Sequence, residues 1–368
     1  MRLTLLTSLQ EIAHVFVFIA VLSPVFTKIS EHGLQYDPGN GGTIMEILHK
    51  EISDGLPFTI DSVVITARSG ITAEFMSLGA CIRKVALLSP EGRERVLTLS
   101  YAGYSSYPGC GSYAGMTVGP NAGRIPASDG LTANDGPNQL HGGFHNLSML
   151  NWKLVNITDT FDRCSVTYTV SQPDGTDGWP GNRIYRVTYT LTEPGTIDIE
   201  LSAVSDKRTY INMTNHTYWL LDSSESCISS KRLRIHADRI CINDSGFLPV
   251  SIIPLTHPYG DDTVSLDSNW NNGFILRGPV HTLRPAAELY DTETRTGICI
   301  STTSPAVTLY TGDYLKRGEK LLGGSSFPHC AAAIEPQEIP SVMERTYTSP
   351  EHPFYRHIRF VIDKHISL

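Results

Sequence analysis

Four residues of this sequence place a charged or imidazole side chain where such side chains are uncommon. Arg124 ends the glycine-containing run TVGPNAGR, and His141 stands between turn residues in NDGPNQLHGG. His216 is flanked by aromatic residues in NHTYW, and Glu335 follows the apolar run AAAI. A carboxylate and an imidazole can exchange protons with a bound molecule, and an arginine can stabilise negative charge on its oxygen atoms. Together the four residues predict a site for general acid–base chemistry.

Each of these residues also has an ordinary structural interpretation. A histidine beside aromatic rings is usually hydrogen-bonded in a core or at a surface, and a glutamate after an apolar strand is usually a surface charge at the strand end. An arginine in a glycine-rich loop is usually solvated. The loop before Arg124 has neither the GxGxxG nor the GxxxxGK[ST] pattern of a phosphate-binding loop. Taken singly, none of the four residues supports a function.

The segments between these positions alternate apolar and polar residues, from about Thr59 to the C-terminus. Such alternation is typical of half-buried antiparallel strands. Frequent glycine and proline, 31 and 22 residues, mark turns between the strands. Because strands do not alternate with long helices, we expect an all-β fold, a large antiparallel β-sandwich. Each of four segments is expected to place its apolar residues on one face of its strand: Cys164, Val166, Tyr168 and Val170; Tyr185, Val187, Tyr189 and Leu191; Ile197, Ile199, Leu201 and Ala203; and Ile358, Phe360 and Ile362.

The N-terminal part differs from the rest of the chain. Residues 12–26 form an apolar stretch that His14 interrupts and that is short for a membrane span. We therefore predict a signal peptide or N-terminal anchor over 1–27, a linker over 28–57 and one domain over 58–368. A signal peptide implies a secreted protein or one in the secretory pathway, with no stable membrane insertion after its removal. A cytosolic extension is the alternative, which would make the protein cytoplasmic.

Composition limits the partners and cofactors. The formal net charge is -8 and there is no basic run, so nucleic acid is not an expected partner. The cysteines form no CxxC pair and lack zinc-site spacing, so we expect no metal and no cofactor. Scattered cysteines can pair in a secreted chain, but an odd count leaves at least one free. The seven are Cys81, Cys110, Cys164, Cys227, Cys241, Cys299 and Cys330.

Several short motifs, in order along the chain, resemble one known family. They are GRI at 123–125, LHGG at 140–143 preceded by NDGPN, GWPG at 178–181, NHTYW at 215–219 and EPQ at 335–337. With this order and spacing, the sequence resembles the aldose 1-epimerase, or galactose mutarotase, family. The resemblance runs from about residue 58 to the C-terminus. Several short matches in order are stronger than any one of them alone.

The resemblance implies a galactose mutarotase-like supersandwich and an isomerase that interconverts the α and β anomers of a free hexose without a cofactor. It implies that Glu335 is the general base and His216 the general acid. Arg124 and His141 would bind and polarise the sugar. We expect Glu335 to be ionised and His216 protonated in the resting pair, or the converse in the ring-opened state.

The sequence departs from the family pattern at three positions. Pro120 replaces an arginine that many members carry, and Gly123 replaces an asparagine beside the binding arginine. In NWNNGFIL, Asn271 stands where the family has an aspartate that binds the sugar. We therefore expect Asn271 to be a substrate-binding residue, and the departures leave the preferred sugar open. Trp179, in the GWPG loop, is a further candidate for the cleft.

Two alternatives remain from the sequence. One is an epimerase for a different sugar, such as a hexose phosphate, a ketose or an oligosaccharide end. The other is a non-catalytic carbohydrate-binding protein on the same scaffold, which the presence of both Glu335 and His216 disfavours. A glycosidase would need a pair of carboxylates, and only Glu335 is a convincing site carboxylate in the sequence.

Overall fold

The computed structural model describes residues 45–128, 130–222, 226–255 and 263–363. Within these ranges the regular secondary structure is β-strand apart from four short 3-10 turns, η1 (Tyr104–Ser106), η2 (Leu147–Met149), η3 (Thr176–Gly178) and η4 (Ile228–Ser230). The predicted signal peptide or anchor over 1–27 lies outside the described residues. Over the part that is described, no helix has the length and apolar character needed to cross a membrane.

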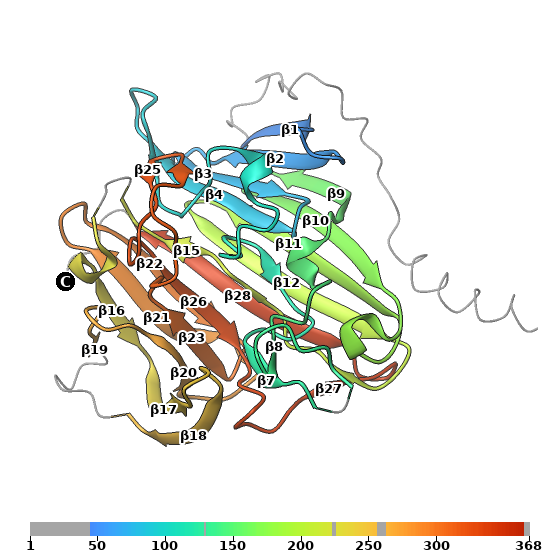
Figure 1. Ribbon diagram of the computed structural model, residues 1–368. Coiled ribbons are helices and arrows are strands. Elements are labelled where there is room, and N and C mark those ends of the chain that lie inside the picture. Colours follow the sequence, from blue (N-terminus) through green and yellow to red (C-terminus); the bar gives the residue numbers. More distant parts are fainter. Residues whose placement is uncertain (1–44, 129, 223–225, 256–262, 364–368) are drawn as a thin grey trace, which may run out of the picture.

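A long nine-stranded sheet forms one layer of the molecule (Figure 1). Its neighbouring strands pair antiparallel throughout. In spatial order the strands are β19 (Thr263–Val264), β16 (Arg232–Ile235), β21 (Arg284–Asp291), β22 (Thr296–Thr302), β28 (Phe354–Asp363), β12 (Thr196–Ser205), β11 (Arg183–Thr192), β10 (Arg163–Gln172) and β9 (Lys153–Thr160).

The apolar faces predicted for the four segments together form the buried face of this sheet. All of the apolar residues predicted on β11, β12 and β28 are buried, as are the first three of the four on β10, and Val170 is half-buried. The residues between them point to the other face and are mostly exposed or half-buried. The fold class predicted from the sequence, an all-β antiparallel sandwich, is confirmed.

Two smaller sheets cover that buried face. The five-stranded sheet consists of β1 (Glu46–Ile52), β2 (Ile60–Thr66), β3 (Ile71–Met76), β4 (Cys81–Leu88) and β5 (Glu94–Val96). The six-stranded sheet consists, in spatial order, of β15 (Tyr218–Trp219), β26 (Ala332–Gln337), β23 (Ala306–Tyr310), β20 (Asn271–Leu276), β17 (Ala237–Asn243) and β18 (Pro249–Pro254).

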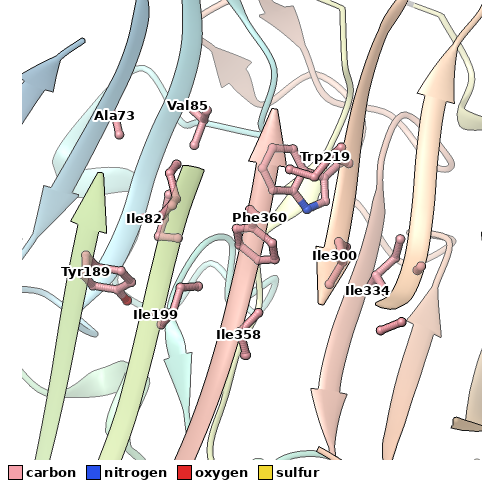
Figure 2. Close-up of a cluster of buried hydrophobic side chains, with 14 of the residues drawn as sticks. Ala73, Ile82, Val85, Tyr189, Ile199, Trp219, Ile300, Ile334, Ile358 and Phe360 are labelled. Carbon is pink, nitrogen blue, oxygen red and sulfur yellow. The ribbon is translucent and has the colours of Figure 1, made fainter. Parts of the chain in front are cut away.

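Aromatic pairs join the two layers. Phe75 of β3 stacks on Tyr189 of β11, with ring centroids 4.7 Å apart, and Trp219 of β15 meets Phe360 of β28 edge-on at 5.2 Å. Figure 2 shows Tyr189, Trp219 and Phe360 in one continuous cluster with Ile334 of β26. Such pairs contribute roughly 0.5–1.5 kcal/mol beyond the burial of their area. One core therefore holds both smaller sheets against the large one.

Part of the segment that the sequence predicted as a linker is a β-strand. The linker was expected over 28–57, but Glu46–Ile52 forms β1, which pairs along its whole length with β2. The sequence EILHKEI shows no regular apolar alternation, because β1 is at the sheet edge and has no fully buried residue. An edge strand needs only one hydrogen-bonded neighbour, so it lacks the apolar alternation that identifies a half-buried strand.

Four short ladders complete the described structure. They link loops to the main sheets and carry much of the site. They are β6 (Thr117–Val118) with β14 (Thr214–Asn215), β7 (Arg124–Pro126) with β8 (Asn138–Leu140), β13 (Thr209–Tyr210) with β27 (Tyr347–Thr348) and β24 (Lys320–Leu321) with β25 (Gly324–Ser325).

Candidate active site

Strand β26 carries Glu335 on the face opposite the main core. Ile334 points into the core between the layers, and successive side chains of a strand point to opposite faces. Glu335 therefore points away from the core, yet only 3% of it is exposed because loops cover this face. A carboxyl group at this position is shielded from water, so the side chains of the covering loops are its neighbours.

His216 lies in the link between β14 and β15. Its backbone N–H donates to the Met116 carbonyl and its own carbonyl accepts from the Gly115 N–H, both at 2.9 Å. The neighbouring Asn215 side chain donates to the Gly115 carbonyl at 2.8 Å. These bonds fix the imidazole so that its Nε2 lies 3.5 Å from Oε1 of Glu335.

Arg124 and His141 come from the hairpin formed by β7 and β8. Arg124 pairs with Leu140 across the hairpin, so His141 is the next residue beyond the ladder. The Gly123 N–H donates to Nδ1 of His141 at 3.2 Å, and the His141 N–H donates to the Gly123 carbonyl at 3.1 Å. Because Nδ1 accepts a hydrogen bond, a neutral His141 carries its proton on Nε2 and can donate from there.

The glycine after His141 is required by close backbone approach. Gly142 has φ +92°, and a Cβ atom there would lie 2.4 Å from the Gly119 carbonyl oxygen. Any other residue would push the loop, and His141 with it, away from the hairpin. The LHGG motif thus has a structural function: it lets the loop pack closely enough to bring the His141 ring within 5.5 Å of the His216 ring.

Burial disfavours charge on both members of the His216–Glu335 pair. It raises the pKa of Glu335 to about 8, although the Arg124 guanidinium lowers it. Burial also lowers the pKa of His216 to about 4. For His141, burial first and the positive charge of His216 and Arg124 next hold the pKa well below its usual range. The pair therefore carries one proton at neutral pH, and in the free site the neutral form is favoured over the ion pair expected from the sequence.

Three buried polar atoms of this region have no hydrogen-bond partner among the described residues. They are Oε2 of Glu335, Nδ1 of His216 and Oε1 of Gln337, two residues further along β26. Leaving such an atom unsatisfied costs about 1–3 kcal/mol.

Tyr113 forms an aromatic wall beside the two histidines. Its ring centroid lies 4.6 Å from that of His141 and 6.0 Å from that of His216. A ligand rich in hydroxyl groups can supply the missing partners, and an aromatic wall suits a sugar ring.

Comparison with known proteins identifies the family. The profile of the family described as Aldose 1-epimerase matches residues 61–348. The chain belongs to the aldose 1-epimerase family. The family is one of isomerases, so the chain is an enzyme of that class.

Individual relatives agree with this assignment. The chain is 27% identical to the aldose 1-epimerase of Escherichia coli over 323 residues, which covers 82% of this chain and 90% of that protein. It is 26% identical to the galactose mutarotase of Sus scrofa, covering 76% and 86% of the two chains. The crystal structure of galactose 1-epimerase from Lactobacillus acidophilus superposes with a TM-score of 0.76 at 23% identity, covering 88% of this chain and all of the other.

The structure brings together four of the five predicted site residues directly. Asn271, the fifth, begins β20 and pairs with Tyr310 of β23. Two residues along, Gly273 pairs with Thr308, which pairs with Glu335. Directly paired residues share a face, so Asn271 is on the Glu335 side of the sheet, two strands away. A bound sugar would have to span that separation to reach both side chains.

Trp179 is not the cleft residue that its loop suggested. Its side chain is buried with Ile125, Tyr210 and Leu131 in a small cluster. Its indole N–H donates to the Gly142 carbonyl at 3.3 Å. Trp179 therefore supports the loop that carries His141 from behind, and the GWPG motif has a structural function here.

The sequence did not indicate two residues that hold Arg124. Oδ2 of Asp135 accepts a hydrogen bond from Nε of Arg124 at 2.6 Å, and the ring of Phe247 lies 5.4 Å from the guanidinium carbon. Asp135 could have been suspected, because it lies in the NDGPN turn just before β8. Phe247 lies in the turn between β17 and β18, more than 120 residues from Arg124, and no local pattern could have indicated it.

We expect replacement of Asp135 by alanine to raise KM several-fold with a smaller effect on kcat. Asp135 holds the Nε side of the guanidinium, which leaves the two Nη groups of Arg124 to face a sugar. Charge-assisted bonds of this kind contribute roughly 1.5–3 kcal/mol when shielded, and the partial exposure of Asp135 reduces that value. Steady-state kinetics with one sugar over a range of concentrations measures the change.

The Asp135→Asn variant is the matched comparison, since its amide oxygen can still accept from Nε, and it should retain most of the affinity. Asp162→Ala, an exposed carboxylate in the turn between β9 and β10, controls for loss of a surface charge. An unchanged KM in Asp135→Ala would show that the hydrogen bond from Arg124 to Asp135 does not contribute to sugar binding.

Proposed function

We propose that this protein interconverts the α and β anomers of a free hexose by acid–base ring opening and closure. The observation that carries the proposal is the buried pair of His216 and Glu335, with Nε2 and Oε1 3.5 Å apart, beside Arg124 and His141. The family assignment and the relatives named aldose 1-epimerase and galactose mutarotase support the same activity.

The reaction needs one proton removed and one delivered. Glu335 takes the proton of the anomeric hydroxyl while His216 gives a proton to the ring oxygen, and the bond between C1 and the ring oxygen breaks. Rotation about the C1–C2 bond presents the other face of the aldehyde. The two residues then exchange functions as the ring closes, so the site returns to its starting protonation state. General acid–base catalysis of this kind is typically worth 10²–10⁴-fold.

Arg124 prepares the pair for this reaction. The neutral pair favoured by burial holds its proton on Glu335, where it blocks the base. The Arg124 charge acts against this by lowering the pKa of Glu335. A sugar hydroxyl that donates to the carboxylate acts in the same direction. Sugar binding thus moves the proton from Glu335 to His216 and sets the site for ring opening.

His141 contributes by binding. Its Nδ1 is occupied by the Gly123 N–H, and its low pKa leaves it neutral with a proton on Nε2. A neutral N–H donor close to the His216 ring can hold a sugar oxygen in place without competing for the transferred proton. This separates the function of His141 from that of His216.

Polarimetry tests the proposed activity directly. Freshly dissolved α-D-glucose and α-D-galactose change optical rotation slowly on their own, and catalytic amounts of the protein should accelerate the change to the same end point. Addition of EDTA should leave the rate unchanged, since the proposed steps use only Glu335, His216 and their neighbours. A rate equal to that of the protein-free solution for both sugars would contradict the proposal for these substrates.

We expect a bell-shaped dependence of kcat/KM on pH. Below a pKa of about 4, both His216 and Glu335 hold a proton and no base is available. Above a pKa of about 8, both have lost it and no acid is available. The two apparent pKa values of this profile describe the His216–Glu335 pair as a whole and not its separate residues. Rates from pH 3.5 to 9.5, corrected for the uncatalysed reaction, give the two limbs, and an alkaline limb that remains flat to pH 9.5 would contradict the one-proton pair.

We expect Asn271→Asp to lower KM several-fold for at least one of the two sugars. A carboxylate accepts charge-assisted hydrogen bonds that are about twice as strong as neutral ones, and it replaces the donor half of the amide by a second acceptor. The gain corresponds to roughly 1 kcal/mol. The measurement is KM for glucose and galactose in both forms of the enzyme. An unchanged KM for both sugars in a folded variant would place Asn271 outside the site.

A further inference from the structure

One more backbone hydrogen bond joins the two stretches of chain beyond the antiparallel contact between β15 and β26. Within that contact, Trp219 of β15 pairs with Ala332 of β26. Further from it, the Ile228 N–H, at the start of η4, donates to the carbonyl of His329, in the turn before β26, at 2.7 Å.

This hydrogen bond holds Cys227 and Cys330 close together. Cys227 precedes the donor and Cys330 follows the acceptor. Standard bond lengths therefore keep their Cα atoms within about 8 Å for any orientation of the two peptide groups. Disulfides need Cα atoms roughly 4.4–6.8 Å apart, a separation that this hydrogen bond allows. Cys227 has an extended backbone, with φ -70° and ψ 145°.

The two cysteines differ in access. Cys227 is exposed, whereas Cys330 is buried in an apolar cluster that includes Leu220 and Leu321. One thiol can thus meet a dissolved reagent, and the other can be reached only by its neighbour. All seven cysteines are free thiols in the described structure.

We propose that Cys227 and Cys330 are a disulfide-forming pair that links the segments carrying the catalytic histidine and glutamate. His216 lies shortly before Cys227 in the chain and Glu335 shortly after Cys330, on the two sides of the β15–β26 contact. The bond would close a loop of about 100 residues, a length at which a cross-link strongly restricts the unfolded chain.

The oxidant in the proposed reaction is a low-molecular-weight disulfide such as oxidised glutathione. The exposed Cys227 thiolate attacks it, forms a mixed disulfide and releases one thiolate. The Cys330 thiolate then attacks the Cys227 sulfur, forms the protein disulfide and releases the second thiolate. Both cysteine protons go to solvent, and the two electrons go to the reagent. Burial, together with the nearby Cys227, raises the pKa of the Cys330 thiol, so the second step should be faster at higher pH.

Disulfide mapping of the full chain tests the pair. The purified protein is reduced, then incubated at low concentration with oxidised glutathione at pH 8, alkylated and digested without reduction. Mass spectrometry should find the peptide of Cys227 joined to that of Cys330. The oxidised protein should melt about 5 °C or more above the reduced form, from the usual stabilisation by a loop of this size, and dithiothreitol should reverse the shift.

Matched variants separate this pair from other thiols. Cys227→Ser, an exposed position that should not affect folding, must abolish both the linked peptide and the gain in melting temperature. Cys299→Ser, a half-buried cysteine on β22, must leave both intact. Recovery of Cys227 and Cys330 as alkylated thiols after oxidation, or of Cys227 joined to any other cysteine, would overturn the proposal.

Discussion

Replacing Glu335 with glutamine is expected to lower kcat by at least about 10², within the 10²–10⁴-fold range typical of a general base. Glutamine has nearly the same size and keeps one acceptor oxygen, so the packing of β26 should persist. It cannot take a proton from the anomeric hydroxyl. It also removes the proton that the His216–Glu335 pair shares, so no residue of the described pair can supply both functions. Polarimetric rates at saturating sugar, compared with the protein-free rate, measure the effect.

The buried position of Glu335 makes folding the first control. The amide removes a carboxyl group that burial disfavours in its charged form, so the variant should be as stable as the parent or more stable. Glu319→Gln, a half-buried carboxylate that accepts from the Tyr101 hydroxyl, controls for the same substitution elsewhere and should keep full activity. A kcat above about a tenth of the parent value would exclude Glu335 as the base.

The sequence predicted the large sheet well because burial there follows a period of two. Tyr185, Val187, Tyr189 and Leu191 alternate with polar residues, and the structure buries all four. The same reasoning failed at β1, where the strand uses its backbone for pairing and buries little. Side-chain alternation reports which face is covered, and it carries no information on an edge strand whose faces are both accessible.

Motif order predicted which residues lie close together better than it predicted their electrostatic state. Nothing in the local sequence of His216 or Glu335 shows that both side chains lose nearly all contact with water. The sequence therefore suggested an ion pair, whereas burial raises the pKa of Glu335 and lowers that of His216. Burial depends on loops far away in the chain, such as that of Tyr113. Charge state is a property of the assembled site.

Membership in a family motif also did not distinguish residues that line the site from residues that hold its loops in place. LHGG and GWPG were both matched as family motifs, yet one supplies His141 to the site and the other supports it through Trp179 and the Gly142 carbonyl. Asp135 and Phe247, which hold Arg124, belong to turns whose positions depend on hairpin packing. A single sequence shows which residue types occur in order, and the direction of each side chain follows only from the fold.

Replacing His216 with asparagine is expected to lower kcat by about 10²-fold or more while raising KM by much less. A general acid acts mainly in the transition state, so its loss appears in kcat. Asparagine retains a hydrogen-bonding group near the ring oxygen of the sugar, which preserves part of the binding. It has no proton to give at any accessible pH. The measurement is kcat and KM for a single sugar, at the pH optimum of the parent enzyme.

The matched variant is His141→Asn, because the two imidazoles lie side by side, are both buried and differ in their partners. Nδ1 of His141 accepts a hydrogen bond from the Gly123 N–H. Burial first, and the charges of His216 and Arg124 next, hold the pKa of His141 well below its usual range, so it stays neutral and acts through binding. His216 is the imidazole that faces Glu335, with which it can share a proton. His141→Asn should therefore raise KM and lower kcat together, since it loosens a contact made in both the ground and transition states. If His216→Asn changed only KM while His141→Asn abolished kcat, the acid would have to be His141, and the 3.5 Å contact between His216 and Glu335 would serve to position the carboxylate.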